Sequence, residues 1–270
     1  MLHLSGCTYT WLHQEPLEHA LAALADHGFT TFELTTASPH LFTRHCGPYE
    51  RARLKRLLGS LGLRPVSVNP SYADINVIST NPEIQRISEQ QIASEIELAH
   101  ELGAEFVVLI PGRRHQLAPA PADAAIAVLH GVLERLAARA EQLGVTLTLE
   151  NSPYGFLGTS AEQLEIVERF DSPHLGLTYD VANALAIEDP CEALRKIAGR
   201  LRLVHVSDTW TDRWAHTSVG RGEVDFAAFA ATLREVGYSG TTVYELVDGE
   251  PAEPRLRSDL AELEKAGWSV

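Results

Sequence analysis

The sequence has no long hydrophobic run, few cysteines and few basic residues. No apolar stretch approaches the ~20 residues that a membrane-spanning helix needs, and the segment 1–10 lacks the basic start and long apolar stretch of a signal peptide. We therefore expect a cytoplasmic protein with no membrane partner. The three cysteines, Cys7, Cys46 and Cys191, are odd in number and far apart, which favours free thiols in a reducing compartment.

Basic residues are outnumbered, with 22 Lys and Arg against 36 Asp and Glu, and the formal net charge is −14. Proteins that bind phosphate backbones gain affinity from clustered Lys and Arg, so this balance disfavours nucleic acid as a partner. A local basic pair, Arg113 and Arg114, is present. An acidic surplus by itself more often serves solubility than function.

The sequence does contain a repeating pattern of a helical segment, a glycine and a β-rich run. Glycine is favoured just past a helix because it adopts the left-handed conformation without a side-chain clash. The runs that follow, such as 106–110 and 145–149, are almost continuously apolar, which is typical of strands covered on both faces. The glycines at these boundaries are Gly28, Gly62, Gly103, Gly144 and Gly237.

Helix starts are also visible in the sequence. Asn81 and Asp189 each put a capping side chain before a proline suited to the first helical turn. Ser160 and Gln163 fit a capping box. Between the β-rich runs, apolar residues recur at steps of three and four, as in 126–143, which predicts helices.

Eight β-rich runs alternate with these helical segments. No linker rich in Pro, Gly or Ser divides the chain, so we predict one α/β domain over residues 1–270, a single (β/α)8 TIM barrel. A doubly wound open sheet is the alternative, but no glycine-rich phosphate loop follows the first predicted strand. The strands are predicted near residues 3–8, 29–35, 64–69, 105–110, 145–150, 174–180, 201–206 and 241–246.

Four predicted strands end in a side chain that can bind a metal ion, namely Glu150, Asp180, His205 and Glu245. Barrels place chemistry at the C-terminal ends of their strands. Two Glu, one Asp and one His make a mostly oxygen site that suits one Mn²⁺, Mg²⁺ or Co²⁺ ion, with Zn²⁺ also compatible. The alternative is that each acid caps the next helix. Four such residues at equivalent strand positions favour the metal site.

These strand ends belong to longer segments, LTLEN, GLTYDVANA, LVHVSD, HTSVGRGEVDF and VYEL, preceded by FELTTASPHL, SVNPSYADIN and ELGAEFVVLIPG. In their order and spacing they resemble the xylose-isomerase-like barrel superfamily of sugar isomerases, epimerases and AP endonucleases. The resemblance covers essentially the whole chain. It implies that Glu150, Asp180, His205 and Glu245 coordinate a divalent metal ion.

The sequence departs from the DNA-repair members of this superfamily, which use additional His ligands to hold three zinc ions. It has Asn69, Ile110 and Asn183 where those members have His. Ile110 has no ligand atom, and a neutral amide is a poor zinc ligand compared with imidazole. We therefore expect one metal ion, and an AP-endonuclease-like phosphodiesterase becomes the least favoured activity.

The resemblance implies a metal-dependent isomerase or epimerase of a small sugar or keto-polyol. The metal would chelate the carbonyl and adjacent hydroxyl of a small polyhydroxylated carbonyl substrate and stabilise an enediolate. Glu150 and Glu245 would remove and return the proton. A dehydratase of the keto-inositol or 3-dehydroshikimate type would use the same groups and stays open. A non-catalytic binding barrel is disfavoured because all four ligands are present.

Further polar and aromatic residues are candidates for substrate binding. Amides can hydrogen-bond substrate hydroxyls. His216 has three interpretations: a fifth metal ligand, a substrate contact or a surface loop residue. Aromatic rings can cover the C–H groups of a sugar, or pack at the rim or between the subunits of a homo-oligomer. The candidates are Asn69, Asn183, Asp208, His216, Trp11 and Tyr72.

Overall fold

Eight parallel strands close into a barrel in the computed structural model, which describes residues 1–70, 72–170 and 172–270. Each strand pairs with the next along the chain, and β1 (Leu2–Cys7) closes the barrel by pairing with both β2 (Thr31–Thr36) and β8 (Thr241–Tyr244). The predicted (β/α)8 fold is confirmed. The other strands of the barrel are β3 (Arg64–Pro70), β4 (Phe106–Leu109), β5 (Thr146–Glu150), β6 (Leu175–Asp180) and β7 (Leu201–Val206).

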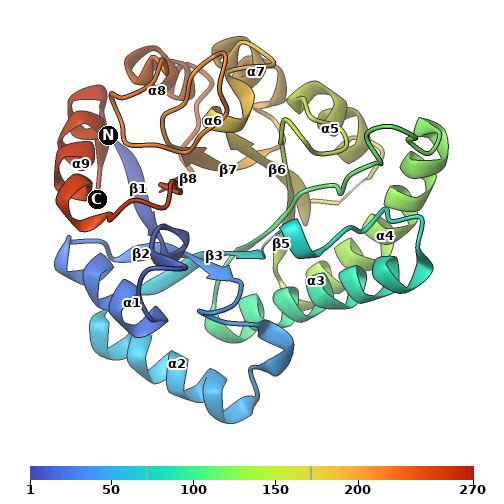
Figure 1. Ribbon diagram of the computed structural model, residues 1–270, viewed down its shortest axis with the longest axis horizontal. Helices are drawn as coiled ribbons and strands as arrows, with labels where there is room; N and C mark the ends of the chain where they lie inside the picture. The colour runs from blue at the N-terminus through green and yellow to red at the C-terminus, as the bar shows by residue number, and fades with distance from the viewer. Residues whose placement is uncertain (71, 171) are drawn as a thin grey trace.

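The longer helices surround the strands and follow one another around the barrel in chain order (Figure 1). They are α1 (Leu17–Asp26), α2 (Pro48–Leu61), α3 (Pro82–Leu102), α4 (Ala122–Leu143), α5 (Ser160–Val167), α7 (Pro190–Ile197), α8 (Phe226–Glu235) and α9 (Glu253–Ala266). Shorter elements follow strand ends or lie in loops: α6 (Val181–Ala184) and the 3-10 helices η1 (Thr8–Trp11), η2 (Thr43–His45) and η3 (Tyr72–Asp74). No helix within the described ranges has the length and apolar character that crossing a membrane requires.

Apolar side chains pack on both faces of the strands, which explains their continuous hydrophobic runs. Val107 and Leu109 of β4 belong to the large cluster that the helices cover. The alternate residues, Phe106 and Val108, pack in a smaller cluster with side chains from β1, β7 and β8. Because successive side chains of a strand point to opposite faces, this second cluster fills the interior of the barrel.

Most predicted helix boundaries are confirmed. Asn81 and Asp189 cap α3 and α7 by accepting backbone N–H groups. The glycines Gly62, Gly103 and Gly144 follow α2, α3 and α4 in the left-handed conformation. These local signals hold because they depend on residues next to each other in the chain.

The predicted capping box at the start of α5 is wrong by one residue. Thr159 and Glu162 form it instead. Gln163 cannot do so because its side chain donates to the backbone carbonyls of Glu150 and Leu157. The hydrogen bond to Glu150 ties α5 to the last residue of β5, which is itself a predicted site residue.

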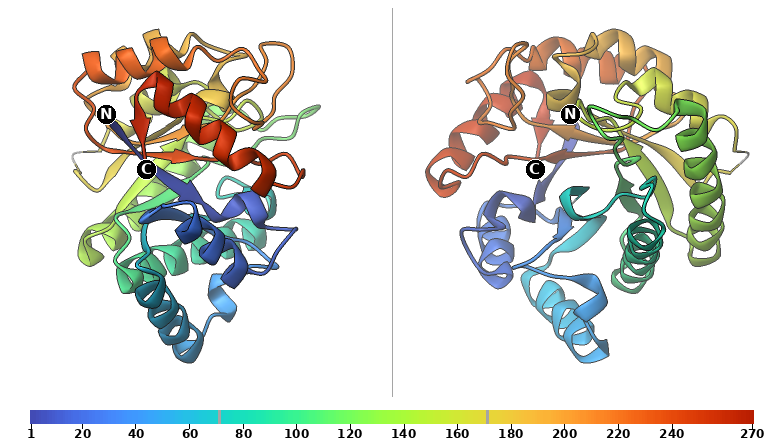
Figure 2. Two further views of the ribbon diagram at one scale, coloured as in Figure 1. Left: turned by 90° about the vertical axis from the view of Figure 1, so that its left-hand side faces the viewer. Right: turned by 45° about the vertical axis from the view of Figure 1, so that its right-hand side comes forward.

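A short strand that the sequence did not predict, β9 (Trp268–Ser269), pairs with the first residues of β1. The two ends of the chain therefore lie close together (Figure 2). The indole of Trp268 is fully buried and makes an edge-to-face contact with Phe226 at the start of α8, with 6.3 Å between the ring centroids. The C-terminal segment thus helps to hold β1 in the barrel.

We predict that Trp268→Ala lowers the free energy of unfolding by about 3–5 kcal/mol, because it empties a buried aromatic site. The matched control is Tyr49→Ala, which truncates an exposed aromatic side chain and should change stability by no more than about 0.5 kcal/mol. Urea unfolding monitored by circular dichroism measures both values. Similar losses in the two variants would contradict a specific role for Trp268.

Candidate metal centre

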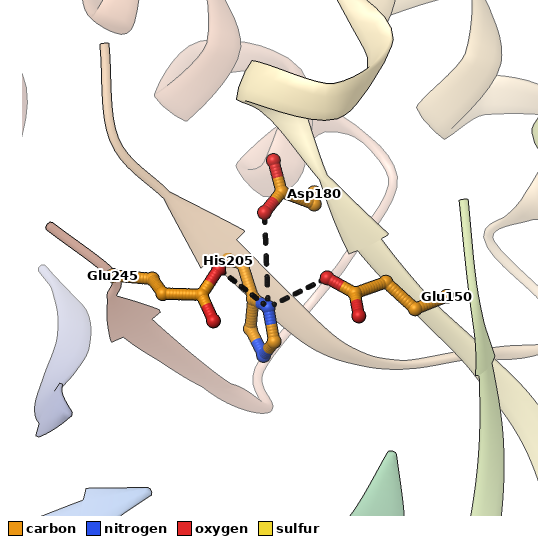
Figure 3. A group of neighbouring side chains, drawn as sticks. All are labelled: Glu150, Asp180, His205 and Glu245. Carbon is orange, nitrogen blue, oxygen red and sulfur yellow. Dashed lines mark hydrogen bonds and ion pairs between the residues drawn. The ribbon is translucent and has the colours of Figure 1, made fainter. Parts of the chain in front are cut away.

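Strand alternation directs the predicted ligands into the barrel. On β5, Leu147 and Leu149 pack under the helices, so Glu150 points to the interior. The same holds on β6, where Leu177 and Tyr179 pack under the helices, so Asp180 points to the interior. The carboxylates and the His205 ring consequently converge at the C-terminal ends of the strands (Figure 3).

The four predicted ligands form one compact, buried group. Their candidate ligand atoms all lie within 4.8 Å of one another. The Nδ1 atom of His205 is 3.0 Å from Glu150 Oε1, 3.4 Å from Glu245 Oε2 and 3.8 Å from Asp180 Oδ2. Figure 3 shows the three carboxylates approaching this nitrogen from different sides. The fold therefore brings together the four residues that the sequence predicts as metal ligands.

Asp180 tests whether this group suits a cation. Its Oδ1 accepts the backbone N–H of Asn183 and caps α6, so the helix-capping interpretation holds for this oxygen. Its Oδ2 is buried without a hydrogen-bond partner and faces the other ligands. A buried carboxylate oxygen with no donor is unfavourable. A divalent cation would satisfy it, so the donor set fits a metal ion.

Burial and mutual repulsion change the proton affinity of the group. Burial raises the pKa of Glu150 and of Glu245 to about 7, against an opposing effect of His205. Burial disfavours the charged form of His205, but the carboxylates of Glu33, Glu245 and Glu150 raise its pKa well above the ordinary value. Near neutral pH the group therefore retains protons that a bound metal ion would displace.

Sequence reasoning missed Glu33, which lies on the inward face of β2 and is fully buried. Its carboxylate is 3.1 Å from His205 Nε2 and accepts hydrogen bonds from Ser67 and Asn69. Although burial opposes ionisation, His205 and these two donors lower the pKa of Glu33. A carboxylate between Phe32 and Leu34, inside a predicted strand, was the signal that could have identified it.

A cavity of about 240 Å³ borders Glu150 and Glu245. Four of the predicted substrate-binding residues line it: Asn69, Tyr72, Asn183 and His216. It is also lined by Ser152, whose buried hydroxyl has no hydrogen-bond partner, and by Tyr9, neither of which the sequence singled out. Burial raises the pKa of Tyr9 to about 12, so its phenol stays protonated at neutral pH.

His216 lies at this cavity, and the surface-loop interpretation does not fit it. Its Nδ1 is 3.4 Å from Glu245 Oε2 and 3.7 Å from Asp180 Oδ2, and its Nε2 is 3.2 Å from Asn183 Oδ1. Trp214 donates its indole N–H to the same Asn183 oxygen at 2.7 Å. A metal ligand and a substrate contact both remain compatible with this position.

Two predicted substrate-binding residues lie outside the cavity. The carboxylate of Asp208 is buried and accepts four backbone N–H groups of the loop between β7 and α8, from Thr209, Gly220, Gly222 and Val224. It organises this loop, because its oxygens are already saturated with donors. Trp11 is buried at the end of η1 and borders a different groove, beside the start of α9.

Comparison with known proteins gives the family and a similar structure. A family model described as xylose isomerase-like TIM barrel matches residues 21–266. The chain is similar to a crystal structure of a D-tagatose 3-epimerase-like protein, with a TM-score of 0.84 and 25% identity over 98% of this chain and 99% of that chain.

Curated relatives include two kinds of enzyme. The chain is 28% identical to a ketose 3-epimerase from Arthrobacter globiformis over 187 residues, which are 67% of this chain and 63% of that protein. It is 35% identical to a probable endonuclease 4 from Oleidesulfovibrio alaskensis over 182 residues, which are 60% of each protein. The residues at the cavity must therefore distinguish between the two chemistries.

The raised pKa values predict how pH affects stability without metal. In the folded state Glu150 and Glu245 have a pKa of about 7, above the ordinary value of 4.5, and that of His205 is also raised. The folded state then binds more protons than the unfolded state, so stability falls as pH rises through this range. We expect chelator-treated protein to lose stability between about pH 5 and pH 7.

Urea unfolding at the two pH values measures this loss. The double variant Glu150→Gln/Glu245→Gln removes both titrating carboxyls, so its loss should be smaller than that of the wild type. An equal loss in the two proteins would show that other groups cause the pH dependence.

Proposed function

Because the chain belongs to the xylose isomerase-like TIM barrel family, we propose that it is a divalent-metal-dependent isomerase or epimerase of a small sugar or keto-polyol. The observation that carries the proposal is the pair Glu150 and Glu245. Both border one cavity, and both carboxylates lie close to Nδ1 of His205, at 3.0 and 3.4 Å. The similarity to a ketose 3-epimerase and to a D-tagatose 3-epimerase-like protein supports the same chemistry.

Glu150, Asp180, His205 and Glu245 would hold the ion. Three carboxylates and one imidazole suit Mn²⁺, Mg²⁺ or Co²⁺, and Zn²⁺ is also compatible. When bound, such an ion supplies positive charge that stabilises negative charge developing on a substrate carbonyl oxygen.

Proton transfer falls to the two glutamates. One carboxylate accepts the proton of the carbon that lies between the carbonyl and a hydroxyl, and the C–H electron pair becomes the double bond of an enediolate. The other glutamate, starting as the acid, donates its proton to the opposite face of that carbon.

Two amides flank this pair. Asn69 Nδ2 is 3.4 Å from Glu245 Oε1, and Asn183 Nδ2 is 3.5 Å from Glu150 Oε1. These weak contacts orient each carboxylate and leave the amides close to the hydroxyls of a substrate in the cavity.

The cavity favours a sugar over a phosphodiester. The described residues that line it include no lysine or arginine, and Ile110 contributes an apolar wall. Asn69 and Asn183 bring amides in place of metal-binding imidazoles. The net charge of −14 also opposes a nucleic acid duplex. We therefore infer that the substrate is a small polyhydroxylated carbonyl compound and not abasic DNA.

The proposal predicts proton exchange next to a carbonyl. Metal-loaded protein, incubated in D₂O with a panel of ketoses, keto-inositols and keto acids, should place deuterium at this carbon and form the epimer or isomer, as NMR detects. Glu150→Gln and Glu245→Gln should each reduce turnover by about 10²–10⁴-fold without unfolding. Glu262→Gln, at an exposed position of α9, is the matched control.

Other outcomes of these assays would contradict the proposal. Near-wild-type turnover in either glutamate variant would remove the acid–base assignment. Loss of water from the substrate would identify a dehydratase instead. Metal-dependent incision of an abasic-site duplex at low salt, abolished by Asp180→Ala, would replace the sugar chemistry with nuclease activity.

We also predict one divalent ion per chain. A second group of ligand-type side chains within the described ranges, Cys7, Glu33 and Glu245, shares Glu245 with the first group. Its Glu33 carboxylate is already hydrogen-bonded to protein donors. Elemental analysis of purified protein should give a ratio of one, which His205→Ala lowers. A ratio of three zinc ions would contradict the single-site assignment.

A further inference from the structure

The His205 ring lies between carboxylates on two opposite sides. Its Nδ1 faces the group formed by Glu150, Asp180 and Glu245. Its Nε2 lies 3.1 Å from Glu33 Oε2, which belongs to a strand on the other side of the barrel interior. The ring is fully buried, so its orientation is set by protein groups and not by water.

The carboxylate of Glu33 is held by groups from three other strands. Ser67 donates its hydroxyl to Oε2 at 2.7 Å, and Asn69 donates its amide to Oε1 at 2.9 Å. The thiol of Cys7 is 3.8 Å from Oε1, and His205 Nε2 completes the set. Four donors from β1, β3 and β7 surround a fully buried acid. It therefore has little freedom to move away from the imidazole.

An acceptor fixed at Nε2 determines which nitrogen of a neutral imidazole carries the hydrogen. With the hydrogen at Nε2, the lone pair is on Nδ1, the atom that faces the three carboxylates. Metal-bound imidazoles commonly donate their other N–H to a carboxylate, which fixes the tautomer and the ring orientation. Glu33 is in the position to accept this hydrogen bond.

We propose that Glu33 is a positioning residue that holds His205 with Nδ1 directed at the metal ion. The inference rests on the proposed metal-dependent function, because it assigns a role toward that ion. Glu33 does not itself border the cavity that contains the two glutamates. Its effect is on metal affinity and on the His205 tautomer, and it reaches the substrate only through these.

The test compares Glu33→Gln with Glu95→Gln. Glu95 is also fully buried and hydrogen-bonded, but to Thr43 and Gln91 on the helix side of the barrel, so the same substitution there is a matched control. Mn²⁺ affinity is measured by calorimetric titration of chelator-treated protein. We expect Glu33→Gln to bind Mn²⁺ about 10–100-fold more weakly, and Glu95→Gln to bind it as the wild type does.

A second measurement reports the tautomer directly. In Zn²⁺-loaded protein with ¹⁵N-labelled histidine, the His205 signals, assigned with a His205→Asn variant, should show a hydrogen on Nε2 and none on Nδ1. The Nε2–H proton signal should lie at the low field that a hydrogen bond to a carboxylate causes, and Glu33→Gln should move it to higher field, whereas Glu95→Gln should leave it unchanged. A residue that only supports the fold would not shift this one signal selectively.

The outcomes separate this inference from the metal assignment. If the wild type binds neither Mn²⁺ nor Zn²⁺, the proposed metal-dependent function is wrong. If the wild type binds them and Glu33→Gln keeps the wild-type affinity and the wild-type Nε2–H signal, the role of Glu33 is wrong. Should Glu33→Gln fail to fold, Glu33→Asp replaces it, with a smaller loss of affinity expected. Wild-type binding by a folded Glu33→Asp variant, with an unchanged Nε2–H signal, would equally overturn the inference.

Discussion

The site depends on one buried imidazole that faces carboxylates on two sides. Burial disfavours every charge in this group, yet Glu33 and Glu245 raise the pKa of His205 well above its ordinary value. The group is stable only if positive charge, from a proton or a metal ion, offsets its negative charge. The free Oδ2 of Asp180 marks where the protein leaves an acceptor unsatisfied. This imbalance supports the proposal that the group binds a cation.

Barrel closure makes this concentration of charge possible. Strands far apart in the sequence, β2, β5, β6 and β7, each send alternate side chains into one interior. Below the site, Phe106, Val108 and Leu203 fill that interior with apolar groups. Glu150, Asp180 and His205 lie nearer the C-terminal ends of their strands, where the cavity borders Glu150 and Glu245. Alternation points both sets inward, and the order of apolar and polar residues along each strand separates the two layers.

The fold, and the convergence of the four proposed ligands, could be predicted from the sequence because their signals are local. A strand ends where an apolar run meets an acid, as at Glu150, and each run needs only its own neighbours to be recognised. Glu33 was missed because its importance comes from contact with His205, 172 residues away along the chain. Asp208 shows the opposite case, because its sequence position suggests a site residue and its contacts are those of a loop support. It follows a strand as a ligand would, but backbone amides of a later loop occupy its oxygens.

The residues at the cavity, and not the barrel fold, distinguish the two kinds of chemistry found among similar proteins. The chain is similar both to a ketose 3-epimerase and to a probable endonuclease 4, so the scaffold alone does not decide the reaction. At the cavity, Asn69 and Asn183 each lie between a glutamate and another protein group, where an imidazole would add a metal ligand and an amide adds a hydrogen-bond donor. The amide of Asn69 contacts Glu245 and that of Asn183 contacts Glu150, and both glutamates face Nδ1 of His205. Two glutamates facing one centre suit the movement of a proton between the two faces of a carbon more than the clamping of a phosphate by several metal ions.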